Sequence, residues 1–184
     1  MRWQAYSALV YGSRYLGWFL YDTPPAGDYG VAGAPGNWRD MVQERDGSFT
    51  RRYAMFRRLN AEILAIGDTL LRIESTGVFH TSPLPGETRD VADSELVQSI
   101  QDGQWIVGEF ADNSGRRFFM LVNRDFTHEQ VAVMTFKENR NIDRLFEISK
   151  ADGKKVPVAD FDPESRSLTL TVVAGGGRLF ALDS

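Results

Sequence analysis

QWIVGEFADNSGRRFFMLVNR, residues 104–124, is the stretch that decides the fold class. Two runs rich in β-branched and aromatic residues, 104–112 and 116–124, flank the turn sequence Asp112-Asn-Ser-Gly115. Such runs are typical of strands, and a short connection containing asparagine and glycine is typical of a hairpin. The stretch therefore predicts two antiparallel strands.

Five more runs of the same kind surround this hairpin, and turn signals separate them. The pairs and triplets Asp152-Gly153 and Gly175–Gly177 suit further hairpins. Seven or eight strands within about a hundred residues predict an antiparallel β-sandwich, which we expect to span 77–184. The additional strands are expected at 78–82, 129–136, 143–149, 167–173 and 178–182.

Two helices are expected before this β-rich part. Residues 2–12 place Trp3, Tyr6 and Val10 on one face. Residues 51–73 show an apolar stripe at spacings of three and four, with Thr50 or Ser48 available as the N-cap. Such a stripe is typical of core packing, so we expect the second helix to cover one face of the β-domain. The stripe consists of Phe56, Leu59, Ile63, Ile66, Leu70 and Ile73.

YLGWFLYDTPP, residues 15–25, lies between the helices and has almost no polar face over 15–21. A near-continuous apolar run predicts a strand that is covered on both sides, as in a parallel sheet, although a buried helix also gives this pattern. A long connection, 22–50, follows. A lone parallel strand needs neighbours, so we expect 1–76 to be a piece of a larger sheet or barrel. The helical pattern already running at residue 2 favours a chain cut from a larger protein over a native start.

Composition excludes several classes of function. The net charge is −4 and the pI is about 5.2, which gives no electrostatic basis for a nucleic-acid partner or an acidic membrane surface. The sequence contains no cysteine, which excludes disulfides, thiol catalysis and cysteine-bound metals. It also has no apolar run of membrane-spanning length and no signal-peptide pattern at its start. The cellular compartment remains open.

RWQAYSALVYGSRYLGWFLYDTPP, residues 2–25, resembles the last helix–strand unit of the (β/α)₈ barrel in retaining glycoside hydrolases, especially β-galactosidase-like bacterial enzymes. The end of the chain, 168–184, and the segment VNRDF, 122–126, are similar to the β-sandwich that follows such barrels. The resemblance implies that 15–21 is the final barrel strand and that 51–73 is the final barrel helix. The loop 22–50 would then lie on the active-site face.

The resemblance also implies that the chain lacks catalytic groups. Retaining glycosidases use two carboxyl groups about 5 to 5.5 Å apart. In the resembled family these groups come from the fourth and seventh barrel strands, neither of which is in this sequence. We therefore expect no catalytic residue, no metal and no cofactor.

Such a segment would retain part of a sugar-binding wall. The resemblance points to Trp18 and Tyr21, for which core packing is the alternative, and to Asp22, which can hydrogen-bond a hydroxyl. Trp38 is either a ligand platform or an anchor of the long loop. Trp105 is a candidate platform on the sandwich, but its run is apolar on both sides, so the face that carries its ring is ambiguous.

Other polar residues favour structural roles. His80 and His128 are the only histidines, and nothing in the sequence pairs them. Asp160, Asp162 and Glu164 alternate as in a calcium loop but lack its glycine and distal glutamate, so we expect a solvated turn.

Three functional hypotheses follow. The chain is the C-terminal accessory part of a barrel glycosidase without activity of its own, a non-catalytic carbohydrate-binding module, or an independent protein-interaction domain. Under the first, carbohydrate is a partner of the whole enzyme. Apolar surface on 15–21 and 56–73 would then be exposed, which predicts self-association.

Overall fold

The computed structural model describes residues 1–18, 42–44, 46–101, 103–138 and 142–183. Our expectations for Tyr21, Asp22 and Trp38 lie outside the described residues, as do those for 19–21 and for most of the loop 22–50. Neither of the two helices in the described part is long and apolar enough to span a membrane.

Two helices precede the strands, α1 (Arg2–Val10) and α2 (Arg51–Leu70). Both were expected. Thr50 caps α2, because its side-chain oxygen accepts a hydrogen bond from the Arg52 backbone N–H at 3.1 Å. The remaining elements are β1 (Ile73–His80), β2 (Arg89–Asp90), the 3₁₀ helix η1 (Val91–Asp93), β3 (Val97–Gln101), β4 (Trp105–Asp112), β5 (Arg117–Asn123), β6 (Gln130–Phe136), β7 (Arg144–Ile148), β8 (Lys155–Pro157), β9 (Phe161–Asp162), β10 (Ser167–Val172) and β11 (Gly177–Asp183).

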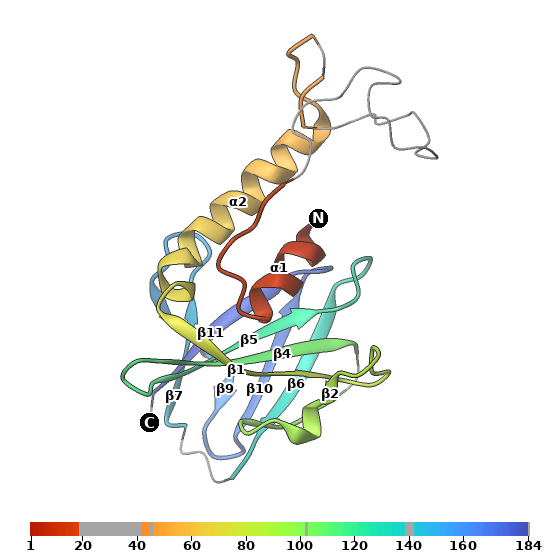
Figure 1. Ribbon diagram of the computed structural model, residues 1–184. Coiled ribbons are helices and arrows are strands. Elements are labelled where there is room, and N and C mark those ends of the chain that lie inside the picture. The colour runs from red at the N-terminus through yellow and green to blue at the C-terminus, as the bar shows by residue number, and fades with distance from the viewer. Residues whose placement is uncertain (19–41, 45, 102, 139–141, 184) are drawn as a thin grey trace.

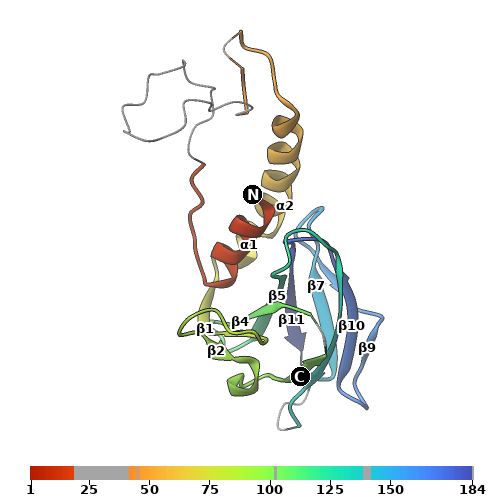
Figure 2. The same ribbon diagram turned by 90° about the vertical axis from the view of Figure 1, so that its right-hand side faces the viewer.

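The strands form two sheets, as the sandwich prediction requires. One sheet has the order β2-β1-β4-β5-β11-β7-β8 and the other β3-β6-β10-β9. Neighbouring strands are antiparallel except β1 and β2, which are parallel. The helices lie outside the seven-stranded sheet, on the side away from the smaller sheet (Figure 1 and Figure 2). The protein is therefore mainly β, with a helical layer on one side.

The turn signals of the sequence were mostly interpreted correctly. Asp112 organises the β4–β5 hairpin, since its carboxylate accepts from the backbone N–H groups of Ser114 and Arg116 at 2.9 and 3.0 Å, and Gly115 has a φ of 82°. Gly153 lies in the β7–β8 hairpin. The hairpin expected at Gly175–Gly177 is wrong, because β10 and β11 belong to different sheets and this connection crosses between them.

The position of β5 between two cores explains why its sequence is apolar without alternation. Phe119 and Leu121 point into the core between the sheets, whereas Phe118, Met120 and Val122 belong to the core beneath the helices. Both faces of the strand are thus buried within this chain. The ring of Phe119 also stacks on that of Phe180 from β11, with centroids 4.7 Å apart.

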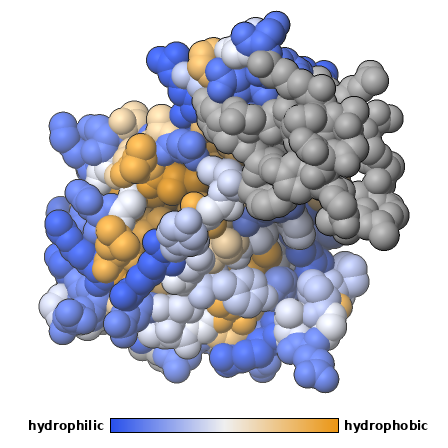
Figure 3. Space-filling model, turned by 45° about the horizontal axis from the view of Figure 1, so that its top comes forward, coloured by the Kyte–Doolittle hydropathy of each residue, from blue (hydrophilic) through white to orange (hydrophobic). Residues whose placement is uncertain are grey.

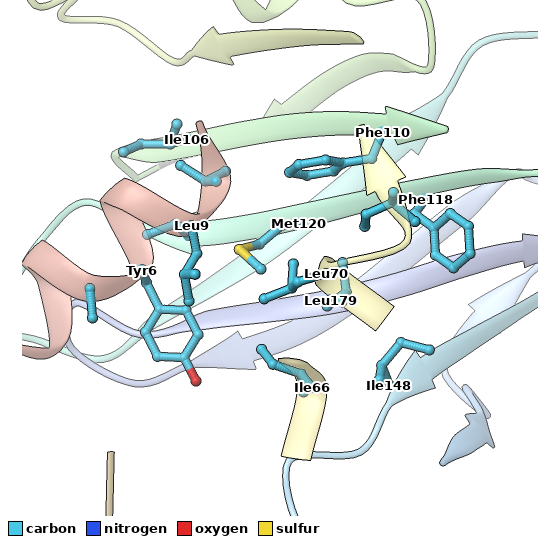
Figure 4. Packing of buried hydrophobic residues seen from close by; sticks show 14 of the residues in the cluster. Tyr6, Leu9, Ile66, Leu70, Ile106, Phe110, Phe118, Met120, Ile148 and Leu179 are labelled. Atoms are coloured by element: carbon cyan, nitrogen blue, oxygen red, sulfur yellow. The ribbon is translucent and has the colours of Figure 1, made fainter. Parts of the chain in front are cut away.

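The core beneath the helices joins α1 directly to the sheet (Figure 4). Tyr6 and Leu9 of α1 lie over the sheet beside Met120, and all three side chains are buried. Glycine at position 108 of β4 permits this close approach, because a Cβ there would collide with the carbonyl oxygen of Val10.

The expectation that α2 covers a face of the β-domain is corrected in one respect. α1 lies on the sheet. The C-terminal part of α2, where Ile66 and Leu70 are buried, reaches the sheet, and the N-terminal part of α2 projects away from it (Figure 2). Of the remaining apolar stripe, Leu59 is buried, Ile63 is partly buried, and Ile73 starts β1. The physical reason is that α1 covers β4 and β5, so α2 meets the sheet where β1 begins directly after the helix.

The expectation of a buried parallel strand is wrong for its described part, residues 15–18. These residues form no strand, and Tyr15 is 83% exposed. Leu16 and Trp18 pack instead against the core that includes α2. This segment therefore buries apolar side chains on one side only, against α2.

Candidate functional site

A groove with a volume of about 400 Å³ lies between α2, the end of α1 and the segment 13–18. We call this cavity the α2 groove. On the face seen when the top of the molecule in Figure 1 is turned toward the viewer, hydrophobic residues form an exposed patch (Figure 3). Its lining consists of Leu9, Ser13, Arg14, Tyr15, Leu16, Trp18, Asn60, Ile63, Leu64, Gly67, Leu70 and Leu71.

Trp18 fixes the segment 13–18 to α2. Its indole N–H donates to the side-chain oxygen of Asn60 at 3.2 Å, and its ring meets that of Phe56 edge-on with centroids 5.0 Å apart. The ring is therefore partly buried and forms one wall of the groove. Among the residues that the sequence suggested for sugar contact, Trp18 is the one that the described structure places here.

Trp105 lies elsewhere. Its side chain is fully buried, at 0% exposure, in the core between the two sheets. Its backbone N–H donates to the hydroxyl of Thr81 at 2.8 Å, which in turn donates to the carbonyl of Gly103 at 3.0 Å. In this fold the ring offers no face to solvent.

The α2 groove exposes mainly apolar side chains. Leu64 is 78% exposed and Leu71 57%, both on or directly after α2. Sequence reasoning did not single out either residue, although both are leucines that lie outside the apolar stripe. Among the described residues that line the groove there is no aspartate or glutamate, so this described surface can pack against apolar groups but offers no carboxylate for acid or base catalysis.

A charged cluster ties α1 to α2 beside the helical core. Glu62 accepts two hydrogen bonds from Arg2, at 2.5 and 3.0 Å, and one from the Tyr6 hydroxyl at 3.2 Å. Burial alone would raise the pKa of Glu62, but the hydrogen bonds and charge of Arg2 outweigh it and lower that pKa. Burial, followed by the charge of Glu62, raises the pKa of Tyr6 well above its ordinary value.

Lys150 completes this cluster, with its ammonium nitrogen 4.7 Å from the centre of the Tyr6 ring. Burial lowers the pKa of Lys150 to about 8, and the charge of Glu62 offsets this only in part. A neutral lysine at mildly alkaline pH is the consequence.

This lowered pKa predicts how stability changes with pH. Between about pH 8 and the ordinary lysine value near 10.5, the unfolded chain binds more protons than the folded one, so the free energy of unfolding rises with pH. Tyr6 acts in the opposite sense above about pH 10, because only the unfolded chain then loses its proton. We expect a rise of about 1 kcal/mol from Lys150 between pH 8 and 9.5, measured by urea unfolding. Lys150→Met should reduce this rise and the exposed Lys154→Met should retain it; an identical rise in both variants would contradict the prediction.

The two histidines have structural and solvent positions, as expected. His80 is buried between the Tyr11 hydroxyl, 2.8 Å from Nε2, and a guanidinium nitrogen of Arg124, 3.4 Å from Nδ1. Burial, aided by the charge of Arg124, lowers the pKa of His80 and favours its neutral form. His128 is exposed and contacts Asp125, with Nδ1 and Oδ2 3.0 Å apart.

Two further acidic side chains, Asp162 and Glu109, serve local structure. Asp162 accepts from the backbone N–H of Glu164 at 3.0 Å and from the Ser165 hydroxyl at 2.5 Å, which is the geometry of a solvated turn. Glu109 is buried, and it accepts from the Ser94 hydroxyl and from the Leu96 backbone N–H at the start of β3. Across the described ranges, histidine, aspartate and glutamate do not gather in any group of three or more that could hold a metal ion.

Comparison with solved structures gives a weak structural likeness. No family model and no curated protein matches the sequence. A crystal structure from Bacteroides fragilis, described as an alpha-galactosidase/melibiase, aligns with 43% of this chain at 16% sequence identity and a TM-score of 0.33. The alignment covers 16% of that protein, so this chain matches a small part of its length.

Proposed function

We propose that this chain is a non-catalytic C-terminal part of a glycoside hydrolase, in which the β-sandwich supports a catalytic barrel. The α2 groove carries the proposal, since its described lining is open, largely apolar and without carboxylates. The resemblance of 2–25 and 168–184 to the end of a β-galactosidase-like barrel enzyme supports the same assignment. The two-sheet β-rich architecture agrees with the sandwich that this role needs.

The barrel is the proposed occupant of the α2 groove. Fully burying a leucine side chain contributes about 1.5–3 kcal/mol, and Leu64 and Leu71 gain only a part of this on folding of this chain because they remain largely exposed. A neighbouring barrel helix or strand would cover them and the ring of Tyr15 together. In the chain by itself, the same surface favours association between copies.

The catalytic part of the proposal predicts that the chain alone cleaves no glycosidic bond. A panel of nitrophenyl α- and β-glycosides, followed by release of nitrophenolate, should show no turnover above the buffer rate. An intact β-galactosidase measured in parallel confirms that the assay works. Robust turnover by this chain would show a pair of reacting groups that the proposal denies.

The docking part predicts self-association that depends on the groove. Light scattering after size exclusion should show an apparent mass that rises with protein concentration. Leu64→Lys places a charge in the groove and should give a monomer, whereas Val156→Lys, at an exposed position of β8, should behave like the unmodified chain. A monomer at every concentration would argue against the groove as a docking surface.

A further inference from the structure

Trp3 and Phe126 form an exposed aromatic pair on the opposite end of α1 from the α2 groove. Trp3 is 37% exposed and Phe126 is 69% exposed. Their ring centroids lie 6.3 Å apart and their planes are inclined by 56°, so the two rings form an open corner. They come from α1 and from the β5–β6 connection, two segments far apart in the sequence.

A buried asparagine holds the frame of this corner. The amide nitrogen of Asn123 donates to the carbonyls of His128 at 2.8 Å, of Val172 at 3.1 Å and of Val173 at 3.3 Å. Its amide oxygen accepts from the backbone N–H of Asp125 at 2.9 Å. One side chain thus pins the β5–β6 connection to the end of β10.

The residues on either side of Phe126 are fixed by a second set of bonds. The Asp125 carboxylate accepts from the backbone N–H groups of Thr127 at 2.7 Å and His128 at 3.1 Å, and from the Thr127 hydroxyl at 2.5 Å. These bonds hold the loop in a tight turn that displays the Phe126 ring instead of burying it. The ring is therefore presented on a pre-organised loop, which lowers the entropic cost of binding.

Trp3 is held on the other side by the β10–β11 connection. A Cβ on Gly175 would come within 2.7 Å of the Trp3 Cβ, so glycine lets the connection pass directly beneath the tryptophan. The backbone N–H of Gly175 donates to the Asp125 carbonyl at 2.8 Å, which links the supports of the two rings. Val173, 47% exposed, adds apolar surface two residues before Gly175.

We propose that the Trp3–Phe126 corner binds one sugar ring of a saccharide chain, a site that rests on the proposed glycoside-hydrolase function for its ligand class. The C–H groups on one face of a pyranose form a small apolar surface with partial positive charge, which suits the negative face of an aromatic ring. Two rings and one valine are too few for a protein partner, because stable protein interfaces bury about 800 Å² on each side.

A polar group beside the corner suits the hydroxyls of a sugar. The side chain of His128 is 79% exposed, and its Nδ1 is engaged by Asp125 at 3.0 Å and by the Thr127 hydroxyl at 2.8 Å. Because Nδ1 is engaged in these contacts, Nε2 is the ring nitrogen left for a further partner. A hydroxyl of the bound sugar hydrogen-bonds to this nitrogen.

The test uses the intact chain and follows the indole N–H signals in a ¹⁵N–¹H NMR spectrum, with Trp3 assigned by its loss in Trp3→Phe. Cellotetraose, xylotetraose and a β-1,4-linked galactotetraose are the probes. At least one should shift the Trp3 signal in a saturable manner, with a dissociation constant in the millimolar range. Phe126→Ala should weaken this binding about tenfold, which corresponds to the loss of one ring contact.

Phe49→Ala is the matched control, since Phe49 is also exposed, at 56%, but stacks on Tyr53 beside the start of α2. It should leave the affinity unchanged. Absence of any Trp3 shift with all three probes, or an equal affinity in Phe126→Ala, would overturn the proposal while leaving the accessory role intact. Saccharide binding by a chain that also hydrolyses nitrophenyl glycosides would uphold this site and refute the accessory role.

Discussion

Gly108→Val is expected to cause one of the two largest losses of stability in this protein. The new Cβ would collide with the carbonyl oxygen of Val10 and lie 2.8 Å from its Cγ2, so α1 must move away from β4. Overpacking of this kind typically costs about 1–3 kcal/mol, and lifting α1 also exposes apolar side chains, so we expect a loss of about 3 kcal/mol or more. The residues that α1 buries are Ala5, Tyr6, Leu9 and Val10.

Urea unfolding followed by far-UV circular dichroism measures this loss. Gly67→Ala in α2 is the matched control, because a Cβ there meets no atom within 4 Å. Alanine in a helix interior should stabilise the protein by about 0.5–1 kcal/mol relative to glycine. Equal stability of Gly108→Val and the unmodified chain would mean that α1 does not lie on β4.

Trp105→Ala is the second change with a large expected effect. The indole is fully buried between the sheets, and its removal leaves a cavity where the surrounding strands cannot easily close. Replacing a buried tryptophan by alanine costs about 3–5 kcal/mol. The midpoint of urea unfolding should fall accordingly, with the slope of the transition nearly unchanged.

Phe126→Ala serves as the comparison for Trp105→Ala, since it also removes a large aromatic side chain. Phe126 is 69% exposed, so its removal should change the free energy of unfolding by less than about 0.5 kcal/mol. A Trp105→Ala variant as stable as Phe126→Ala would place the Trp105 ring outside the core. The pair of variants therefore separates a structural aromatic residue from an exposed one.

Local sequence signals identified several strands of the sandwich well, but the strand expected at 78–82 covers only the end of β1 (Ile73–His80), and β3 and β8 were not expected. β4 and β5 were expected within one residue of their ends, and so was the hairpin that Asp112 organises. The short strands β2 and β9, of two residues each, gave no signal. Strands of this length contain too few residues to show a period of two, and only a partner strand defines them.

The near-continuous apolar run at 15–21 was interpreted wrongly in its described part, 15–18. The run in β5 and the run at 15–21 look alike in sequence. β5 has a sheet on one face and helices on the other, whereas 15–18 lies against α2 and leaves Tyr15 exposed. Without alternation, a sequence does not reveal which neighbours cover each face.

Candidate site residues could be predicted only in part. Trp18 lies in the α2 groove, where its neighbours Asn60 and Phe56 belong to a helix more than thirty-five residues later in the chain. Trp105 belongs to a run that places apolar residues on both faces of the strand, so the face that its ring occupies could not be inferred from the local sequence. Neither Trp3 nor Phe126 stood out, because each becomes part of a site only beside the other.

The sequence by itself determined the β-rich fold class, the two helices, the Thr50 cap and the hairpin turns at Asp112 and Gly153, because these depend mainly on contacts between residues close in the chain. Tertiary structure decided that α1 lies on the sheet, that α2 projects with Leu64 exposed, and that Trp3 meets Phe126. These outcomes depend on contacts between segments that are far apart in the chain. The roles of Gly108 and of the buried Asn123 are therefore evident only once the segments that they join are in contact.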